Sequence, residues 1–281
     1  MDTPYAQPTG RTLAASAEAR RAARGSQRPK TRICVCGVMM DPLTMPEVLE
    51  RVKTALRERA RLNISVVNVA KLVNMRKDEM LCRSVTSGDL VLADGMPLVW
   101  LSRLRGPALP ERVTGIDLMY RLFELADREG LRVFLLGATQ DVLDEVIAVA
   151  RRRYPGACIA GARNGYFTER QDEEVARQVR EARADVLLVA MSSPKKELFM
   201  RRWEAFMNVH VCHGVGGSFD VMAGKVRRAP MWMQRYGLEW LYRVVQEPRR
   251  LWRRYLVTNL SFARLALVWL IRGNRSCPGY P

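Results

Sequence analysis

The chain has 281 residues, 48% of them hydrophobic, and a formal net charge of +17. This length allows one large domain, or one domain with an appendage. The charge lies at the ends: residues 1–30 carry six basic and two acidic side chains (net +4), and residues 225–281 carry twelve and two (net +10), which leaves +3 for residues 31–224. A nearly neutral body argues against a nucleic-acid-binding core, and the basic ends favour an anionic partner.

Residues 1–30 are rich in Ala, Arg, Ser and Gly and lack the apolar stretch of a secretory signal, so we expect a disordered basic tail. The six cysteines are scattered, without Cys-x-x-Cys spacing, and the chain has two histidines. These features predict reduced thiols in a cytosolic protein, without a disulfide framework or a metal site.

From residue 31 onward, short apolar runs alternate with amphipathic stretches of helical period. Strands are predicted at 33–38, 64–69, 90–93, 133–136, 186–191 and 209–213. Helices are predicted at 44–60, 116–128, 141–153, 173–184 and 195–206. Thr44 and Glu47 have the spacing of a capping box at the start of the first helix. Apolar strands alternating with helices predict a Rossmann-like parallel sheet, covered by helices on both faces, over residues 31–224.

The alternation stops near Lys225, and residues 225–281 read as a helical basic appendage. Residues 247–272 join an arginine cluster to an apolar segment that Asn259 and Arg264 interrupt. A transmembrane helix needs about 20 apolar residues with few charges. The segment therefore favours an interfacial helix on an anionic membrane surface. The alternative is a helix packed on the core with a solvated basic face.

Glycines and short polar residues follow several of the predicted strands. Ligands of an open parallel sheet bind at the carboxyl ends of its strands, and free N–H groups at a strand-to-helix turn suit a phosphate or a uracil edge. A tight turn or a helix cap explains each feature singly, but together they mark one rim for a nucleotide-linked substrate. The candidates are Asn68, Asp94, Gly95, Gly137, Gly216, Gly217 and Asp220.

Several stretches resemble the WecG/TagA/CpsF glycosyltransferase family, in that family's order. They are "LADGMPLVW" (92–100), "ERVTGIDL" (111–118), "VFLLGAT" (133–139), "SPKKE" (193–197), "GVGGSFDVMAGKVRRAPMWMQRYGLEWLYRVVQEPRR" (214–250) and "RRY" (253–255). The resemblance covers about residues 31–256. It implies an inverting transfer of a sugar from a UDP-sugar to a polyprenyl diphosphate-linked saccharide in bacterial surface or exopolysaccharide biosynthesis. It further implies a peripheral protein on the cytoplasmic face of the inner membrane, with no obligatory metal or other cofactor, and leaves a homo-oligomer open.

Asp94 resembles the proposed catalytic base of this family. An inverting transfer needs a carboxylate that takes the proton of the attacking hydroxyl, and we expect Gly95 to let the backbone turn beside it. Without a metal, the charge of the leaving diphosphate must meet N–H groups and arginines. Arg112 is one candidate, although an ion pair with Glu111 or Asp117 explains it equally well. The appendage offers Arg243, Arg249, Arg250, Arg253 and Arg254.

Two positions depart from the family pattern. The family often has Thr-x-Asn after its second strand, where this chain has Val66 and keeps Asn68. The family's Pro-Lys-Gln-Glu becomes a stretch with Lys196 before Glu197. A cation at a substrate-contacting position favours a uronic acid donor, such as UDP-glucuronic acid, over the N-acetylmannosamine type. The alternative places Lys196 on a solvated helix face, and the donor sugar stays open.

Two other classes of protein compete with this interpretation. A Rossmann-type oxidoreductase or methyltransferase predicts a G-x-G-x-x-G turn after the first strand, but "CGVMMDPLTM" (36–45) has one glycine. A non-enzymatic membrane or nucleic-acid binding protein is suggested by the charge alone. It leaves the strand-end residues unexplained.

Overall fold

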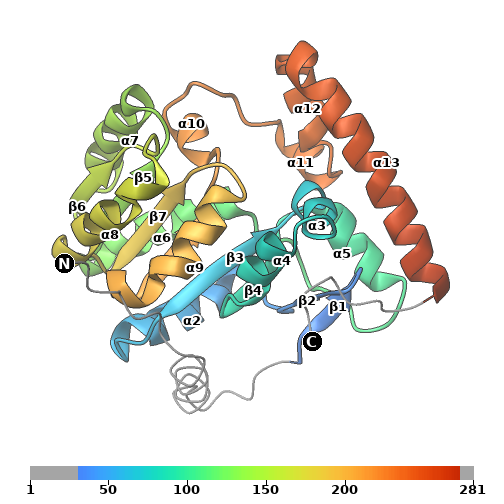
Figure 1. The fold of residues 1–281 in the computed structure, drawn as a ribbon, viewed down its shortest axis with the longest axis horizontal. Helices are drawn as coiled ribbons and strands as arrows, with labels where there is room; N and C mark the ends of the chain where they lie inside the picture. The colour runs from blue at the N-terminus through green and yellow to red at the C-terminus, as the bar shows by residue number, and fades with distance from the viewer. Residues whose placement is uncertain (1–30, 273–281) are drawn as a thin grey trace, which may run out of the picture. The chain divides into compact units, whose positions relative to one another are not determined.

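A computed structural model describes residues 31–272, except the side chains of Arg250, Arg254 and Arg272. The predicted tail, residues 1–30, lies outside the described residues. The centre of the fold is a six-stranded parallel sheet in the order β4-β3-β8-β7-β5-β6 (Figure 1). Its strands are β3 (Leu62–Val67), β4 (Leu90–Ala93), β5 (Arg132–Gly137), β6 (Cys158–Arg163), β7 (Val186–Ala190) and β8 (Val211–Gly214). The predicted α/β parallel-sheet fold is therefore confirmed.

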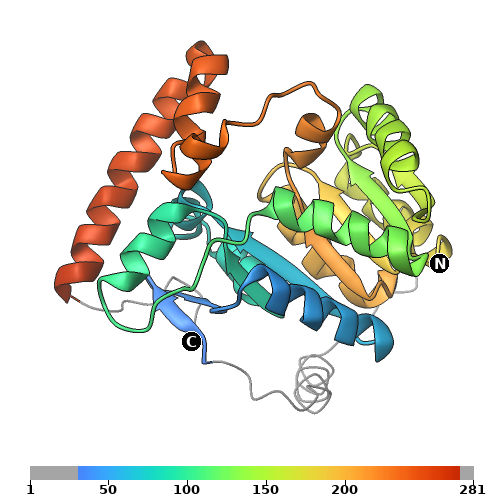
Figure 2. The same cartoon turned by 180° about the vertical axis from the view of Figure 1, so that it is seen from behind.

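Helices cover both faces of this sheet, as Figures 1 and 2 show from opposite sides. On one face lie α2 (Met45–Arg57), α6 (Gly115–Glu129), α7 (Gln140–Arg153) and α10 (Ser218–Met222). On the other face lie α3 (Val69–Met75), α4 (Glu79–Thr86), α5 (Met96–Arg103), α8 (Asp172–Glu181) and α9 (Lys195–Met207), with the short 3-10 helix η1 (Glu169–Gln171) before α8.

Alternate residues of each central strand point to opposite faces. In β5, Leu135 packs in the core under α6 and α7, whereas Phe134 and Leu136 pack in the core under α8 and α9. Both faces are buried, which explains why these strands read as continuous apolar runs. The predicted capping box at the start of α2 is confirmed, because the Thr44 N–H donates to Glu47 Oε2 at 2.9 Å.

The first predicted strand is wrong. Residues 33–38 do not form one strand of the parallel sheet but a hairpin of β1 (Ile33–Val35) and β2 (Val38–Met40). The chain reverses at Cys36 and Gly37, whose φ angles are +49° and +80°, and glycine tolerates this region without a Cβ clash. The Val91 N–H donates to Asp41 Oδ2 at 2.7 Å, which ties the hairpin to β4.

Several short elements were not predicted, among them β6, α3, α4 and α5. The edge strand β6 has mostly partly exposed residues, so its sequence lacks the apolar run of the central strands. Helices α3, α4 and α5 have only seven or eight residues, too few for a clear helical period. Asn68 and Asp78 cap α3 and α4, because their side chains accept the N–H of Lys71 and of Leu81 at 2.9 Å.

From α10 to residue 272, the last that the structure describes, the elements are helices: α11 (Met231–Arg235), α12 (Glu239–Gln246) and the long α13 (Pro248–Arg272), which Figure 1 draws in orange to red. Trp269 of α13 is 4% exposed in the core formed with α3, α4 and α5. Arg105 Nη1 donates to the Trp269 carbonyl at 2.7 Å. One side of α13 thus belongs to the folded body.

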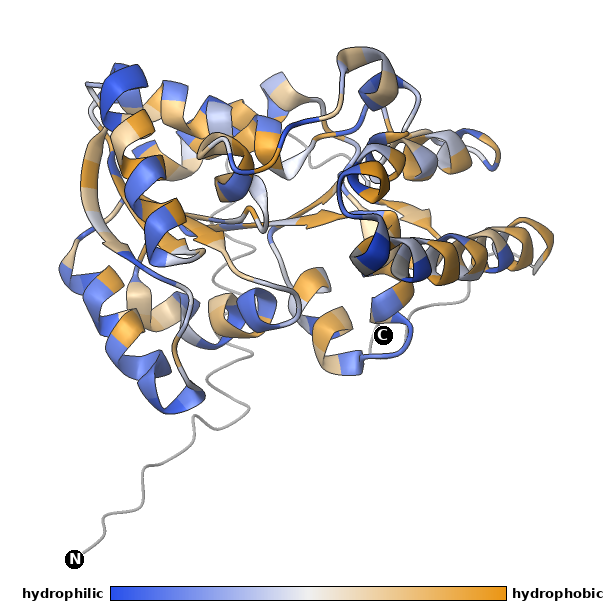
Figure 3. Cartoon of the chain, turned by 90° about the horizontal axis from the view of Figure 1, so that it is seen from above, coloured by the Kyte–Doolittle hydropathy of each residue, from blue (hydrophilic) through white to orange (hydrophobic). Residues whose placement is uncertain are grey.

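The other side of α13 is apolar and uncovered. Leu256, Leu260, Leu267 and Ile271 are between 51% and 72% exposed, and Figure 3 shows hydrophobic positions along this helix. Their spacing of three or four residues, or multiples of it, places them on one helical face. The segment Leu251–Ile271 has a mean hydropathy of 1.2 and is long and apolar enough to cross a membrane, judged by length and composition.

Candidate active site

Asp94 follows β4 directly at the carboxyl edge of the sheet. Its N–H donates to the Val67 carbonyl at the end of β3 (2.8 Å), and the Gly115 N–H donates to its Oδ1 (3.3 Å). The Val113 N–H donates to the Ala93 carbonyl (2.8 Å), so the segment before α6 runs along the end of β4. These bonds hold the partly exposed carboxylate against the first turn of α6.

Gly95 was expected to let the backbone turn after Asp94, but its backbone conformation does not require a glycine. Its φ and ψ of −125° and 132° are open to any residue, and a Cβ there would meet Pro97 Cδ at an ordinary 3.7 Å. The turn after Asp94 therefore does not need a glycine. The missing side chain instead leaves room beside the carboxylate and the start of α3, since Asn68 Cα lies 4.0 Å from that Cβ position.

Asp94 is a stronger proton acceptor than an ordinary aspartate. Burial, followed by the negative charge of Glu239, raises its pKa from 3.8 to about 6. The charges of Lys71 and Arg112 and the Gly115 N–H act in the opposite direction and do not cancel the rise. A carboxylate with a pKa near 6 is still mostly ionised at neutral pH, yet binds a proton more readily, as a general base requires.

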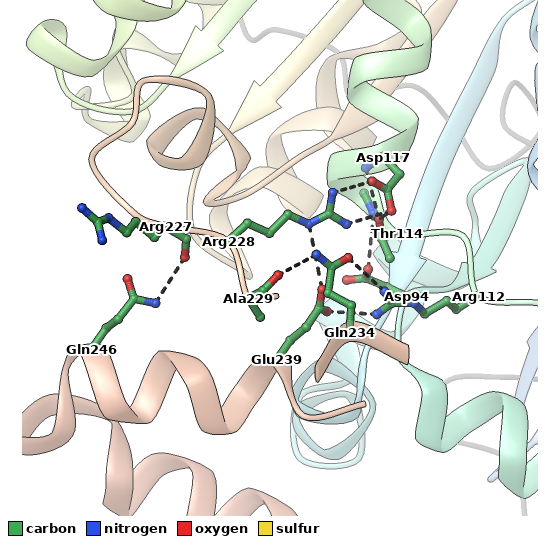
Figure 4. Close-up of polar contacts among 11 residues, drawn as sticks. Asp94, Arg112, Thr114, Asp117, Arg227, Arg228, Ala229, Gln234, Glu239 and Gln246 are labelled. Atoms are coloured by element: carbon green, nitrogen blue, oxygen red, sulfur yellow. Dashed lines mark hydrogen bonds and ion pairs between the residues drawn. The ribbon is translucent and has the colours of Figure 1, made fainter. Parts of the chain in front are cut away.

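A network of charges joins the appendage to the core beside Asp94 (Figure 4). Arg112 Nη1 lies 3.0 Å from Glu239 Oε2 of α12, and its Nη2 donates to Gln234 Oε1 of α11 at 3.4 Å. Arg228 binds the carboxylate of Asp117 in α6 with both terminal nitrogens, at 2.6 and 2.9 Å. Planar bidentate pairs of this kind fix geometry as well as charge.

Arg112 therefore forms a structural ion pair, but with neither predicted partner. Glu111 Oε1 accepts the Met45 N–H at 2.6 Å, and Asp117 is the partner of Arg228. The observed partner, Glu239, is 127 residues away along the chain. Arg228 and Glu239 were not among the predicted site residues, although both lie within the long stretch 214–250 that resembles the family.

A second charged cluster is buried between α3 and α9. Lys71 Nζ and Lys196 Nζ lie 2.8 and 2.6 Å from the same atom, Glu197 Oε1, and the three side chains are between 5% and 9% exposed. Burial and the charge of Lys71 lower the pKa of Lys196 to about 8. Burial alone would raise the pKa of Glu197, but the two lysines outweigh it and the net shift is downward. The alternative of a solvated face for Lys196 is wrong.

His213 of β8 supports the same edge of the sheet. Its ring is fully buried, with Nε2 3.1 Å from the Gly115 carbonyl and Nδ1 3.5 Å from the Ile64 carbonyl. Burial lowers the pKa of His213 to about 4, against the two backbone carbonyls that favour the charged form. The imidazole is thus neutral at pH 7. It anchors Gly115, the residue whose N–H contacts Asp94, a role that no motif in the sequence indicated.

Gly137 is required where β5 ends. Its φ is +130°, and a Cβ there would lie 2.3 Å from the Ala190 carbonyl oxygen of β7. The adjoining Ala138 N–H donates to that same oxygen at 2.9 Å. This amide is therefore used by the fold, whereas a phosphate contact from the other N–H groups of this turn stays a prediction.

The glycine-rich turn after β8 leads into α10. Gly216 has a φ of +54°, and Gly217 is the N-cap of α10. The backbone carbonyl of Asp220 accepts the N–H groups of Lys225 and Val226 at 2.9 and 3.1 Å, which closes the turn after α10. Asp220 thus has a structural role in its backbone, and a substrate contact of its side chain stays a prediction.

Asn68 and Val66, near the start of α3, have different structural roles. Asn68 Oδ1 is occupied as the helix cap described above. Val66 is 7% exposed and packs in the core toward α6, where its Cγ2 lies 3.4 Å from the Cβ position of Gly115. The hydroxyl that the family often has at this position is replaced by a packed methyl group.

The described candidate arginines of α12 and α13, which are Arg243, Arg249 and Arg253, are not among the residues of the network in Figure 4. Arg243 of α12 and Arg249 and Arg253 of α13 are exposed, and the guanidinium of Arg253 lies 5.3 Å from the ring centre of Trp252. Arg250 and Arg254 lie outside the described side chains. Among residues 31–272, no group of three or more His, Cys, Asp or Glu side chains is placed to hold a metal ion.

Comparison with known proteins agrees with this arrangement. The profile of the glycosyl transferase WecG/TagA/CpsF family matches residues 33–276. The chain belongs to this family. It is a glycosyltransferase with a Rossmann-like α/β fold.

Two relatives are named N-acetylglucosaminyldiphosphoundecaprenol N-acetyl-beta-D-mannosaminyltransferase. The protein of Bacillus subtilis (strain 168) is 37% identical over 218 residues, which are 78% of this chain and 82% of the relative. The protein of Bacillus spizizenii (strain ATCC 23059 / NRRL B-14472 / W23) is 39% identical over 172 residues, 61% of this chain and 66% of the relative. By their names, these relatives glycosylate a polyprenyl diphosphate-linked N-acetylglucosamine.

Proposed function

We propose that this glycosyltransferase moves a sugar from a UDP-sugar to a polyprenyl diphosphate-linked saccharide, with inversion at the anomeric carbon. The observation that carries the proposal is the Asp94 carboxylate, held at the carboxyl edge of the sheet by the Gly115 N–H, with a pKa raised to about 6. The names of the Bacillus relatives support a lipid-linked acceptor.

In the proposed reaction, the acceptor hydroxyl oxygen forms a bond to the anomeric carbon while the bond from that carbon to the UDP oxygen breaks. The hydroxyl proton passes to an oxygen of Asp94, and UDP leaves with the bonding electron pair. In this proposal the buried cluster of Lys71 and Lys196, which carries one more positive charge than Glu197 neutralises, stabilises this negative charge. Fixed charges in a partly dry site stabilise a leaving group more than water does.

Two donor sugars have support. N-acetylmannosamine is the sugar in the names of the relatives. A uronic acid such as glucuronic acid is favoured by one observation on this chain: two buried lysines face one carboxylate, Glu197, which leaves one positive charge in excess. A sugar carboxylate would neutralise that charge.

The test is a transfer assay with labelled UDP-sugars and a synthetic polyprenyl diphosphate-N-acetylglucosamine acceptor. We expect a labelled lipid-linked disaccharide with inverted anomeric configuration from wild type, and about 10²- to 10⁴-fold slower formation by Asp94→Asn. Lack of transfer from every UDP-sugar tried, with a folded protein, would remove the proposal.

We also propose that α13 holds the enzyme peripherally on the anionic cytoplasmic face of the inner membrane. Its uncovered face is apolar at Leu260 and Leu267 and basic at Arg249 and Arg253, and such a combination favours an anionic lipid surface. The buried Trp269 opposes a fully inserted helix, since insertion would remove it from the core. Sedimentation with phosphatidylglycerol vesicles, compared with phosphatidylcholine vesicles, tests this placement.

A further inference from the structure

The appendage brings a second carboxylate to the side of Asp94. Glu239, in the first turn of α12, is held with Oε2 3.0 Å from Arg112 Nη1 and Oε1 4.0 Å from Arg228 Nε. Figure 4 draws Asp94 next to this network. Glu239 is thus fixed between two arginines that the core and the preceding loop supply, rather than pointing into solvent.

Arg112 is bound by the appendage, and its positive charge also acts on Asp94 beside it (Figure 4). Its guanidinium is engaged by two appendage side chains, Glu239 and Gln234. Asp94, in contrast, receives the Gly115 N–H at 3.3 Å, a long and uncharged contact. Were Arg112 to bind Asp94 instead, the carboxylate would be stabilised in its charged form and would become a weaker base.

Charged groups face Asp94 from four elements. Glu239 of α12 is negative, whereas Lys71 of α3, Lys196 of α9 and Arg112 of the loop before α6 are positive. The charges of the two lysines are partly compensated by Glu197, which both contact. The balance around Asp94 therefore depends on whether Glu239 is present to offset Arg112.

Resting on the proposed function, we propose that Glu239 is a positioning residue of the transfer reaction: docked against the core, it holds Arg112 in an ion pair and places a negative charge beside Asp94, the base of the transfer (Figure 4). The appendage thereby takes part in the chemistry through the base. Removal of the Glu239 charge acts twice in the same direction, because it deletes a repulsion and releases an arginine.

The experiment measures the pKa of Asp94 without any substrate. The free energy of unfolding is determined from pH 4 to pH 8 for the full chain with and without Asp94→Asn, in the wild-type and Glu239→Gln backgrounds. The pH at which the stability difference changes gives the pKa of Asp94 in each background. We expect a lower pKa in Glu239→Gln, and an acid limb of the transfer rate displaced to lower pH by the same amount.

The control is Glu124→Gln, the same change at an exposed carboxylate of α6 that pairs with Arg121. We expect no displacement there. Glu239→Asp keeps the charge and should keep an acid limb close to that of wild type. A purely structural role for Glu239 would lower stability equally at every pH and leave both curves in place.

The two proposals fail in different ways. An Asp94 pKa that is unchanged or higher in Glu239→Gln overturns the inference, even if transfer is observed. A lowered pKa with an unmoved acid limb overturns the role in catalysis. If no UDP-sugar is transferred by wild type, the proposed function fails, and the stability curves still report whether Glu239 acts on Asp94.

Discussion

Replacement of Asp94 by asparagine should change both the transfer rate and the free energy of unfolding, because the raised pKa of Asp94 affects both. A folded-state pKa of about 6, against an ordinary 3.8, means that the native protein resists ionisation of this carboxyl group. Below pH 3.8 the group is protonated in both states and has no effect. Between pH 3.8 and 6 its ionisation increasingly destabilises the fold, and above pH 6 the cost is complete.

The size of this cost follows from the two values. A difference of one pH unit corresponds to about 1.36 kcal/mol, so the distance from 3.8 to about 6 amounts to at most about 3 kcal/mol. Asparagine keeps the shape of the side chain and its Oδ1 can still accept the Gly115 N–H, but it never ionises. We therefore expect Asp94→Asn to be more stable than wild type by up to about 3 kcal/mol at pH 8, with no gain near pH 4.

The assay is urea unfolding of both proteins at pH 4, 5, 6, 7 and 8, paired with the transfer rate at each pH. Activity of Asp94→Asn should fall by about 10²- to 10⁴-fold, the usual loss for a general base. The wild-type rate should decline as the pH falls below about 6. A stability difference that does not depend on pH, or turnover at the wild-type rate by a folded Asp94→Asn protein, would refute the assignment.

Three further outcomes are expected. The fold disfavours the charged form of His213, so the protein loses stability as the pH falls from 6.5 to about 4 and the imidazole becomes protonated. The Asp94→Asn variant isolates this effect, because it lacks the opposing titration of Asp94, and its free energy of unfolding should fall by up to about 3 kcal/mol over that range. A free energy of unfolding that does not change with pH would contradict the buried neutral imidazole. Lys196→Gln should weaken the binding of a uronic acid donor by roughly one to two powers of ten relative to UDP-N-acetylmannosamine, the value of a charge-assisted hydrogen bond. An unchanged ratio of the affinities for the two donors excludes a role of Lys196 in the choice of donor. Leu260→Glu combined with Leu267→Glu should abolish sedimentation with phosphatidylglycerol vesicles. The free energy of unfolding should stay unchanged, because both side chains are exposed. Met80→Glu on α4 is the control, and an equal loss of sedimentation in that control would show a nonspecific effect of charge.

Deletion of α13 is a less informative experiment than these substitutions. Truncation before α13 would remove Trp269 from the core under α3 and the carbonyl that Arg105 binds. Loss of a buried tryptophan typically costs several kcal/mol. A truncated protein would therefore confuse loss of membrane contact with loss of stability.

The sequence by itself determined the α/β class, the central strands and the position of Asp94. Strands such as β5 and β7 are buried on both faces, so their apolar runs are visible locally, and the residue that follows such a strand must lie at the carboxyl edge. Local chemistry also identified the cap of α2. The edge strand β6 escaped, because its residues are mostly partly exposed and create no such run. Residues 33–38 do form an apolar run, which concealed the reversal of the chain at Cys36 and Gly37.

Only the tertiary structure decided the surroundings of Asp94. The partners of Arg112 and Asp117 lie 127 and 111 residues further along the chain, in α12 and in the loop before α11. No local period or spacing encodes which of many arginines and acids will meet, since that depends on how α11 and α12 dock against α6. The raised pKa of Asp94 is of the same kind, because burial and the distant charge of Glu239 produce it, and neither is a property of the residues beside Asp94 in the sequence.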